Sequence, residues 1–187
     1  RYKFDDLWWV FRLVFKSSRA RRSWYVSWKF LEKGINVPVP LVWGEKRTCR
    51  LIRESFIVTE KIEAVVLEKH LRNLNPPFTL EQIQLKEQLI IDFAYTLKDA
   101  HNKGFFSDDL NVSNILIKTD NNKTTFWFLD FDGAECKKHL SLQGRVKNLL
   151  RLNNNIRSLE PDIITKEDKI KFLKSYAGDD TDLFQVL

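Results

Sequence analysis

The sequence predicts an α+β fold, because it alternates helical patterns with short, strand-like apolar runs. Its 187 residues, 43% of them apolar, are enough for one large domain or two small lobes. Helices are expected at residues 22–33, 65–74, 79–101, 142–152 and 164–176. Strand hairpins are expected at residues 49–59 and 114–129.

The predicted helices carry recognisable end signals. The first stops at Gly34, a residue type favoured just beyond a helix end. In the long helix, Thr79 is a candidate N-cap with Gln82 three residues on, the spacing of a capping box. The last helix has the same spacing in Thr165 and Asp168. These signals predict where three of the helices begin or end.

Two hairpins are expected from the strand patterns. In the first, strands 49–52 and 55–59 flank residues 53–54, after an extended segment that starts at Val37. In the second, strands 114–118 and 125–129 flank a polar turn. The second hairpin would bring its two outer ends together.

Polar residues stand at those two ends. Asn114 follows Asp109 by five positions, and Asp130 and Asp132 follow the second strand. This is the layout of a kinase catalytic loop that leads into a metal-binding strand. Phosphoryl transfer needs a carboxylate that orients the attacking hydroxyl and oxygen ligands that hold Mg²⁺ against the phosphates. We assign Asp109 to the first role, and Asn114 and Asp130 to the second.

An Asp and an Asn at this spacing also fit ordinary turn chemistry at strand ends. The flanking sequences, His-Asn-Lys-Gly-Phe from His101 and Leu-Asp-Phe-Asp from Leu129, favour the kinase interpretation. His101 itself is expected to pack or hydrogen-bond rather than to act in catalysis.

With SRARRSW at residues 18–24 and GINVPVP at residues 34–40, this segment resembles the bacterial lipopolysaccharide kinase family, the Kdo/WaaP and InaA-like group. The resemblance covers nearly the whole chain. It implies a protein-kinase-like, two-lobed fold that lacks the N-terminal part of its small lobe, with residues 1–61 in the small lobe and 62–187 in the large lobe. It also implies ATP and Mg²⁺ as cofactors, and a hinge where Glu60 and Ile62 approach the adenine.

The chain departs from the kinase pattern at several positions. Ser107 stands where a His is usual, and Asp132 where a Gly is usual; Asp132 is either a further metal ligand or a surface turn carboxylate. Helix 22–33 has Ser23 or a neighbour in place of the usual Glu. A Gly-rich phosphate loop is absent, and the phosphate-binding Lys is expected before Arg1. Without any Met, the chain is expected to be a fragment of a longer protein.

The formal net charge of +6 suits an anionic partner. Aromatic and basic residues alternate over residues 5–30, which fits either a membrane-surface contact or a core with a solvated basic side.

No apolar run approaches the roughly 20 residues of a transmembrane span. Nucleic acid is not expected, because its binding signatures are missing. The candidate membrane or substrate contacts are Arg19, Arg21, Arg22, Arg145 and Arg151, although the helix that carries the last two could equally present a solvated face.

These observations predict an ATP-dependent kinase that phosphorylates Kdo or heptose in the lipopolysaccharide inner core. Its expected partners are the lipopolysaccharide core or a lipid A precursor and the anionic inner-membrane surface, and its expected place is the cytoplasmic face of that membrane. Two alternatives remain open at this stage. One is a pseudokinase that serves as a binding module, and the other is a kinase for protein or a soluble small molecule.

Overall fold

The structure is a computed structural model that describes residues 17–49, 51–74, 76–121, 123–157 and 163–178. The aromatic and basic residues before Ser17, part of the predicted interfacial stretch, lie outside the described residues. No helix within those described ranges combines the length and apolar character that crossing a bilayer requires.

The described elements alternate between helix and strand, as the α+β prediction requires. In chain order they are α2 (Arg19–Glu32), β1 (Pro40–Thr48), β2 (Leu51–Thr59), β3 (Val65–Val66), α3 (Leu67–Arg72), α4 (Leu80–Asn102), β4 (Phe105–Ser107), the 3₁₀ turn η1 (Val112–Asn114), β5 (Ile115–Asp120), β6 (Lys123–Phe128), β7 (Ala134–Cys136), α5 (Leu142–Ile156) and α6 (Lys166–Ala177).

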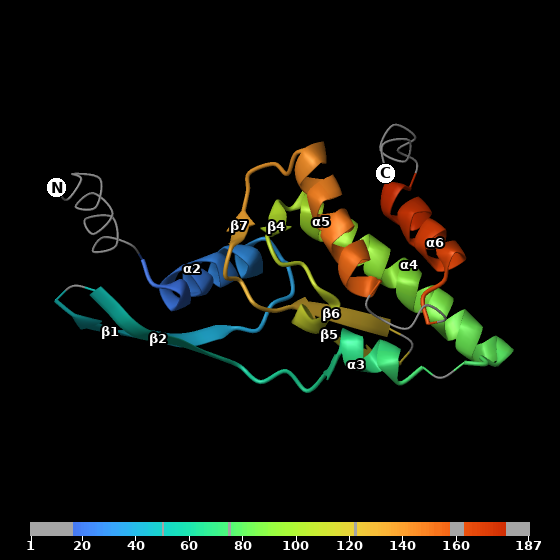
Figure 1. The fold of residues 1–187 in the computed structure, drawn as a ribbon, viewed down its shortest axis with the longest axis horizontal. Helices are drawn as coiled ribbons and strands as arrows, with labels where there is room; N and C mark the ends of the chain where they lie inside the picture. The colour runs from blue at the N-terminus through green and yellow to red at the C-terminus, as the bar shows by residue number, and fades with distance from the viewer. Residues whose placement is uncertain (1–16, 50, 75, 122, 158–162, 179–187) are drawn as a thin grey trace, which may run out of the picture.

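The strands form small antiparallel sheets (Figure 1). The β1–β2 hairpin lies with α2 towards one end of the molecule, and α4, α5 and α6 gather towards the other. Between them are the three-stranded sheet β3-β5-β6 and the pair β4-β7. The chain from β4 through β7 is therefore central, and this is the stretch that carries the predicted catalytic residues.

An aromatic core holds α2 against this central stretch. The Phe30 ring of α2 lies 5.1 Å from the Phe105 ring and 5.5 Å from the Phe131 ring, measured between centroids. Phe105 in turn packs on Phe128 of β6 at 4.5 Å. All four side chains are buried. Burial of large aromatic surfaces supplies much of the free energy that fixes neighbouring elements. Helix α2 therefore shares one core with β4 and with the end of β6.

The predicted helix starts agree with the structure where cap residues marked them. The side chains of Thr79 and Gln82 form a reciprocal capping box at the start of α4, and Thr165 and Asp168 do the same at α6. Ser18 caps α2 by accepting a hydrogen bond from the Arg21 N–H, so this helix starts earlier than the predicted residue 22.

The first hairpin was predicted with the wrong turn. Strand β2 runs on through residues 53–54, and the reversal follows Thr48, the end of β1, where Cys49 adopts a left-handed backbone with φ 50°. Glu54 instead faces Lys46 across the sheet at 4.0 Å. Charged residues at an exposed sheet position look like turn residues in sequence, which explains the error.

Further boundaries differ from the prediction, among them the end of α5, which continues to Ile156 beyond the predicted residue 152. Asn114 ends the 3₁₀ turn η1 instead of opening a strand, and the strand begins at Ile115. The short helix predicted over residues 65–74 is preceded by β3, which pairs Val65 with Ile117 and leaves α3 with six residues.

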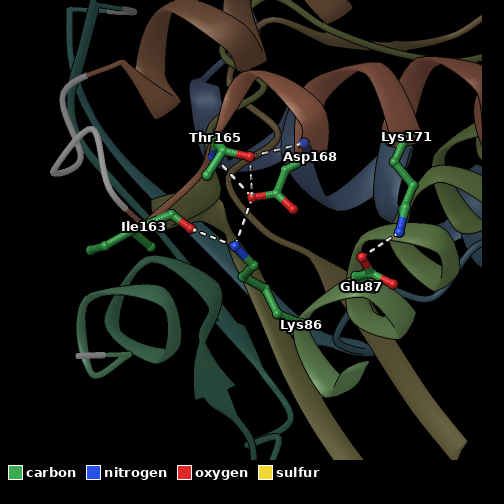
Figure 2. A network of polar contacts seen from close by, with 6 residues as sticks. All are labelled: Lys86, Glu87, Ile163, Thr165, Asp168 and Lys171. Carbon is green, nitrogen blue, oxygen red and sulfur yellow. Dashed lines mark hydrogen bonds and ion pairs between the residues drawn. The ribbon is translucent and has the colours of Figure 1, made fainter. Parts of the chain in front are cut away.

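A buried ion pair joins α4 to α6 (Figure 2). Lys86 Nζ lies 2.7 Å from Asp168 Oδ2, and both side chains are under 10% exposed. The same oxygen accepts hydrogen bonds from the Thr165 N–H and hydroxyl, while Lys86 also donates to the Ile163 carbonyl. A buried charge is tolerable only when it is paired and hydrogen-bonded, and here one carboxylate both caps α6 and neutralises Lys86.

Candidate active site

The predicted catalytic loop and the end of β6 meet in the fold. Asn114 Nδ2 lies 3.4 Å from both the backbone oxygen and Oδ2 of Asp109, and is placed to donate to them. The Leu129 N–H donates to the Asn114 carbonyl at 2.8 Å, which places the next residue, Asp130, beside Asn114. The carboxylates of Asp109 and Asp130 are exposed. The three residues assigned to phosphoryl transfer therefore gather at one solvent-accessible edge.

Backbone geometry turns Asp130 outward. Asp130 has a left-handed conformation with φ 52°, which is uncommon for a residue other than Gly. This turn lets Phe131 point into the core against Phe30 while Asp130 stays exposed. The Asp130 carboxylate accepts the Asp132 N–H at 3.2 Å, a local contact that suits Asp in this conformation.

A network of buried hydrogen bonds connects α5 to the predicted catalytic loop. Asn148 of α5 donates through Nδ2 to the Ser107 carbonyl at 2.6 Å, and its Oδ1 accepts the Ser107 N–H at 3.4 Å. The Ser107 hydroxyl then accepts the Asp109 N–H at 3.1 Å. Ser107 thus braces Asp109 at the position where kinases usually carry a His.

His101 extends this chain, in the structural role predicted for it. Its Nε2 lies 3.2 Å from Asn148 Oδ1 and its Nδ1 lies 2.6 Å from the Tyr176 hydroxyl. Because the Asn oxygen can only accept, Nε2 carries the proton and Nδ1 accepts from Tyr176. Burial, reinforced by the charge of Arg145, lowers the His101 pKa to about 3, so the ring is neutral near pH 7.

The basic side chains of α5 have protein partners. Lys147 Nζ lies 3.0 Å and Arg151 NH2 3.4 Å from Asp108 Oδ1, and the hydrogen bond from Lys147 is the main cause of the lowered Asp108 pKa. Arg145 donates to Asn102 Oδ1 at 2.9 Å. Arg151 therefore fastens α5 to the predicted catalytic loop and Arg145 fastens it to the end of α4, and whether they also meet substrate stays a prediction.

Asp132 pairs with two arginines of α2. Arg19 Nε lies 3.2 Å from Asp132 Oδ2, and Arg22 NH2 lies 3.2 Å from Oδ1. In kinases the corresponding helix usually carries a Glu that pairs with a Lys, whereas here the arginines of α2 pair with an acid that follows β6. The Arg21 guanidinium lies over the rings of Tyr25 and Trp43.

The predicted hinge connects β2 to β3. The Glu60 N–H donates to the Val39 carbonyl at 2.9 Å, and its Oε1 accepts the Val39 N–H at 3.0 Å. The Glu60 carbonyl and the Ile62 N–H have no partner among the described residues. These are the kinds of backbone groups that an adenine ring meets in kinases, so the geometry is compatible with the predicted role.

The sequence matches the lipopolysaccharide kinase (Kdo/WaaP) family over residues 8–176, which is most of the chain. The chain belongs to this family. The heptose(I) kinase WaaP of Pseudomonas aeruginosa is 25% identical over 165 residues, covering 84% of this chain and 59% of the relative. The 3-deoxy-D-manno-octulosonic acid kinase of Pasteurella multocida is 29% identical over 124 residues, covering 66% of this chain and 48% of the relative.

The chain thus spans about three fifths or less of these two relatives. Among solved structures, WaaP in complex with acyl carrier protein superposes with a TM-score of 0.67 at 23% identity, covering 89% of this chain and 73% of that one. The α+β, kinase-like fold of the lipopolysaccharide kinase family is confirmed.

The donor set of the site suits Mg²⁺. Asn114 and Asp130 offer amide and carboxylate oxygens, the hard ligands that Mg²⁺ prefers, and Mg²⁺ typically takes only one or two protein ligands beside phosphates and water. Within the described ranges no three His, Cys, Asp or Glu side chains cluster closely enough to hold a metal alone. A site completed by nucleotide phosphates is therefore the kind of metal site that these residues fit.

Sequence reasoning missed the parts played by Asn148 and Asp108. Asn148 is fully buried, on the same face of α5 as Leu152, four residues on. A polar residue on the apolar face of a helix signals a buried hydrogen-bonded role. The sequence contains that signal, but its partner, the backbone of Ser107, is 41 residues away.

Proposed function

We propose that this protein is an ATP- and Mg²⁺-dependent kinase that phosphorylates a Kdo or heptose hydroxyl of the lipopolysaccharide inner core. The observation that carries the proposal is the hydrogen-bonded pair of Asp109 and Asn114, with Asp130 placed beside it by the Leu129 bond. Membership of the lipopolysaccharide kinase family supports the sugar acceptor.

The residues take the following roles in the reaction. Asp109 orients the acceptor hydroxyl and receives its proton as the acceptor oxygen forms a bond to the γ-phosphorus. The bond from that phosphorus to the bridging oxygen breaks, and ADP leaves. Asn114 and Asp130 would hold Mg²⁺, which offsets the charge on the phosphates. Asn114 also restrains the Asp109 carboxylate through the contact at 3.4 Å.

We further propose that the protein works at the cytoplasmic face of the inner membrane, where a glycolipid acceptor would be presented. The positive net charge supports attraction to anionic lipid. Arg19 is 80% exposed at its side chain, and the same helix, α2, also exposes Tyr25 and Trp28, which are residue types suited to a headgroup region. Loss of binding to anionic vesicles when Arg19 and Arg21 are replaced by Gln would support this placement, and unchanged binding would contradict it.

Nucleotide binding tests the cofactor assignment. Isothermal calorimetry should show ATP binding that depends on Mg²⁺ and is lost in Asp130→Ala, with Asp120→Ala, an exposed strand-end acid, as the matched control. A pseudokinase is the second candidate, and it is favoured because the Glu of α2, Glu32, stands at the far end of the helix and not at the usual position. ATP binding that ignores Mg²⁺, or no ATP binding to the full-length protein, would support the pseudokinase and contradict the proposed kinase.

A further inference from the structure

A cavity lies between α2 and β7, two elements that are in contact (Figure 1). Its volume is about 370 Å³, and Arg21, Arg22 and Lys29 of α2 line it, with Glu135 of β7 among the residues opposite. None of Asp109, Asn114 and Asp130 lines this cavity. It is thus separate from the position proposed for the metal and the nucleotide phosphates.

Two of the three cations, Arg21 and Lys29, form no close ion pair with a described acidic residue. The nearby Glu45 carboxylate is held mainly by hydrogen bonds from Arg47 and Ser18, which lower its pKa, and Arg21 adds a smaller electrostatic effect.

The Arg21 guanidinium carbon lies 5.8 Å from the Tyr25 ring centroid and 5.7 Å from that of Trp43, so these cation–π contacts hold the guanidinium without using its N–H donors. A guanidinium held this way is ready to bind an oxyanion through two parallel hydrogen bonds.

The carboxylates around the cavity are already neutralised. Glu135 lies 3.4 Å from Lys137, and Asp132 is shared by Arg19 and Arg22. The first turn of α2 contains no acidic residue. The cavity therefore keeps an excess of positive charge, which favours an anionic ligand.

Both elements that line the cavity, α2 and β7, also contact residues of the predicted site. Arg22 bonds to Asp132, whose N–H donates to Asp130. On the other wall, Ala134 of β7 pairs with Ser107, two residues before Asp109. The elements that line the cavity are therefore the same ones that contact the residues around Asp109.

We propose that this cavity binds an oxyanion carried by the acceptor, foremost the carboxylate of a sugar acid such as the octulosonic acid of the proposed substrate. This inference rests on the proposed function, because it takes the acceptor to be an acidic sugar. The nucleotide is a poorer candidate, since its phosphates are assigned to Asn114 and Asp130. Binding of the carboxylate by Arg21 and Lys29 would select acidic sugars and hold the acceptor hydroxyl near Asp109.

The test is acceptor binding without ATP, measured by calorimetry. The probes are a deacylated, Kdo-containing core oligosaccharide and the same oligosaccharide with its carboxyl groups reduced to alcohols. The native probe should bind about tenfold more tightly, the effect expected for one charge-assisted contact. Arg21→Gln and Lys29→Gln should each remove most of this preference, and Lys69→Gln on α3, far along the chain, should keep it.

Equal affinity for the two probes, an unchanged preference in both cavity variants, or no oligosaccharide binding would overturn the inference. Inorganic phosphate that binds as tightly as the native probe, and loses this binding in Arg21→Gln and Lys29→Gln, would also overturn it, because the cavity would then be a site for a free anion. The readout is independent of turnover. A wild-type protein that prefers the native probe but transfers no phosphate would therefore contradict the kinase alone, whereas transfer without this preference would contradict the cavity assignment alone.

Discussion

Asn148 holds Ser107 by both of its backbone polar groups, donating to the carbonyl at 2.6 Å and accepting from the N–H at 3.4 Å. Ser107 passes this restraint to Asp109 through its hydroxyl. The catalytic loop is thus fixed from α5 by an amide rather than by a histidine within the loop.

Replacement of Asn148 by Ala should destabilise the protein and impair transfer together. It would leave the Ser107 carbonyl and a ring nitrogen of His101 buried without partners, at a cost of about 2–4 kcal/mol in the free energy of unfolding. Urea denaturation measures this cost, and Asn154→Ala on the exposed face of α5 is the matched control. Equal stability of the two variants would show that the buried network contributes little.

The free energy of unfolding should decrease as the pH is lowered, because of His101. Its pKa is about 3 in the folded protein and about 6.5 when unfolded, so the unfolded chain binds more protons below pH 6.5. The contribution is fully present above pH 6.5 and is lost as pH falls towards 3, by on the order of 5 kcal/mol in total.

The slope of unfolding free energy against pH should therefore be positive between pH 6 and pH 4.5, approaching roughly 1.4 kcal/mol per pH unit from this group. His101→Gln, which cannot titrate, should reduce the slope by about that amount. An identical slope in the variant would show that His101 takes up no proton on unfolding.

The two ion pairs drawn in Figure 2 should differ widely in their importance. Asp168→Ala leaves Lys86 buried without its counter-charge and removes the α6 cap, so we expect a loss of roughly 3–5 kcal/mol in unfolding free energy. Lys171→Ala breaks the exposed pair with Glu87 and should cost less than about 1 kcal/mol. Chemical denaturation of both variants gives the comparison, and similar losses would refute the importance assigned to burial.

Asp132 is expected to position α2 rather than to bind metal, because two arginines hold its carboxylate. In Asp132→Asn, the Mg²⁺ concentration for half-maximal transfer should stay within about threefold of the wild-type value, whereas Asp130→Asn should raise it tenfold or more. A tenfold rise for Asp132→Asn, with Arg19→Gln unaffected, would identify Asp132 as a metal ligand.

Much of the site was predictable because its signals are local in sequence. Asp109, Asn114 and Asp130 belong to one hairpin and its flanks, and a hairpin brings its ends together whatever surrounds it. The capping boxes at Thr79 and Thr165 are local in the same way.

Features that depend on distant partners could not be predicted in this way. The pairing of Asp132 with Arg22 spans 110 residues, and only the docking of α2 through Phe30 and Phe131 creates it. The first hairpin was misplaced because the exposed charges of β2 resemble a turn, whereas the reversal depends on the left-handed backbone of Cys49. Long-range packing decides both features, and spacing along the chain does not encode it.

The most direct test of the proposed function is transfer of labelled phosphate from ATP to a Kdo-containing core oligosaccharide by the full-length protein and its Asp109→Asn variant. We predict Mg²⁺-dependent labelling of the oligosaccharide by the wild type and a loss of about 10²–10⁴-fold in kcat for the variant, with ATP binding retained. Labelling that the variant performs at the wild-type rate would contradict the role of Asp109, and no labelling by the wild type would contradict the kinase itself.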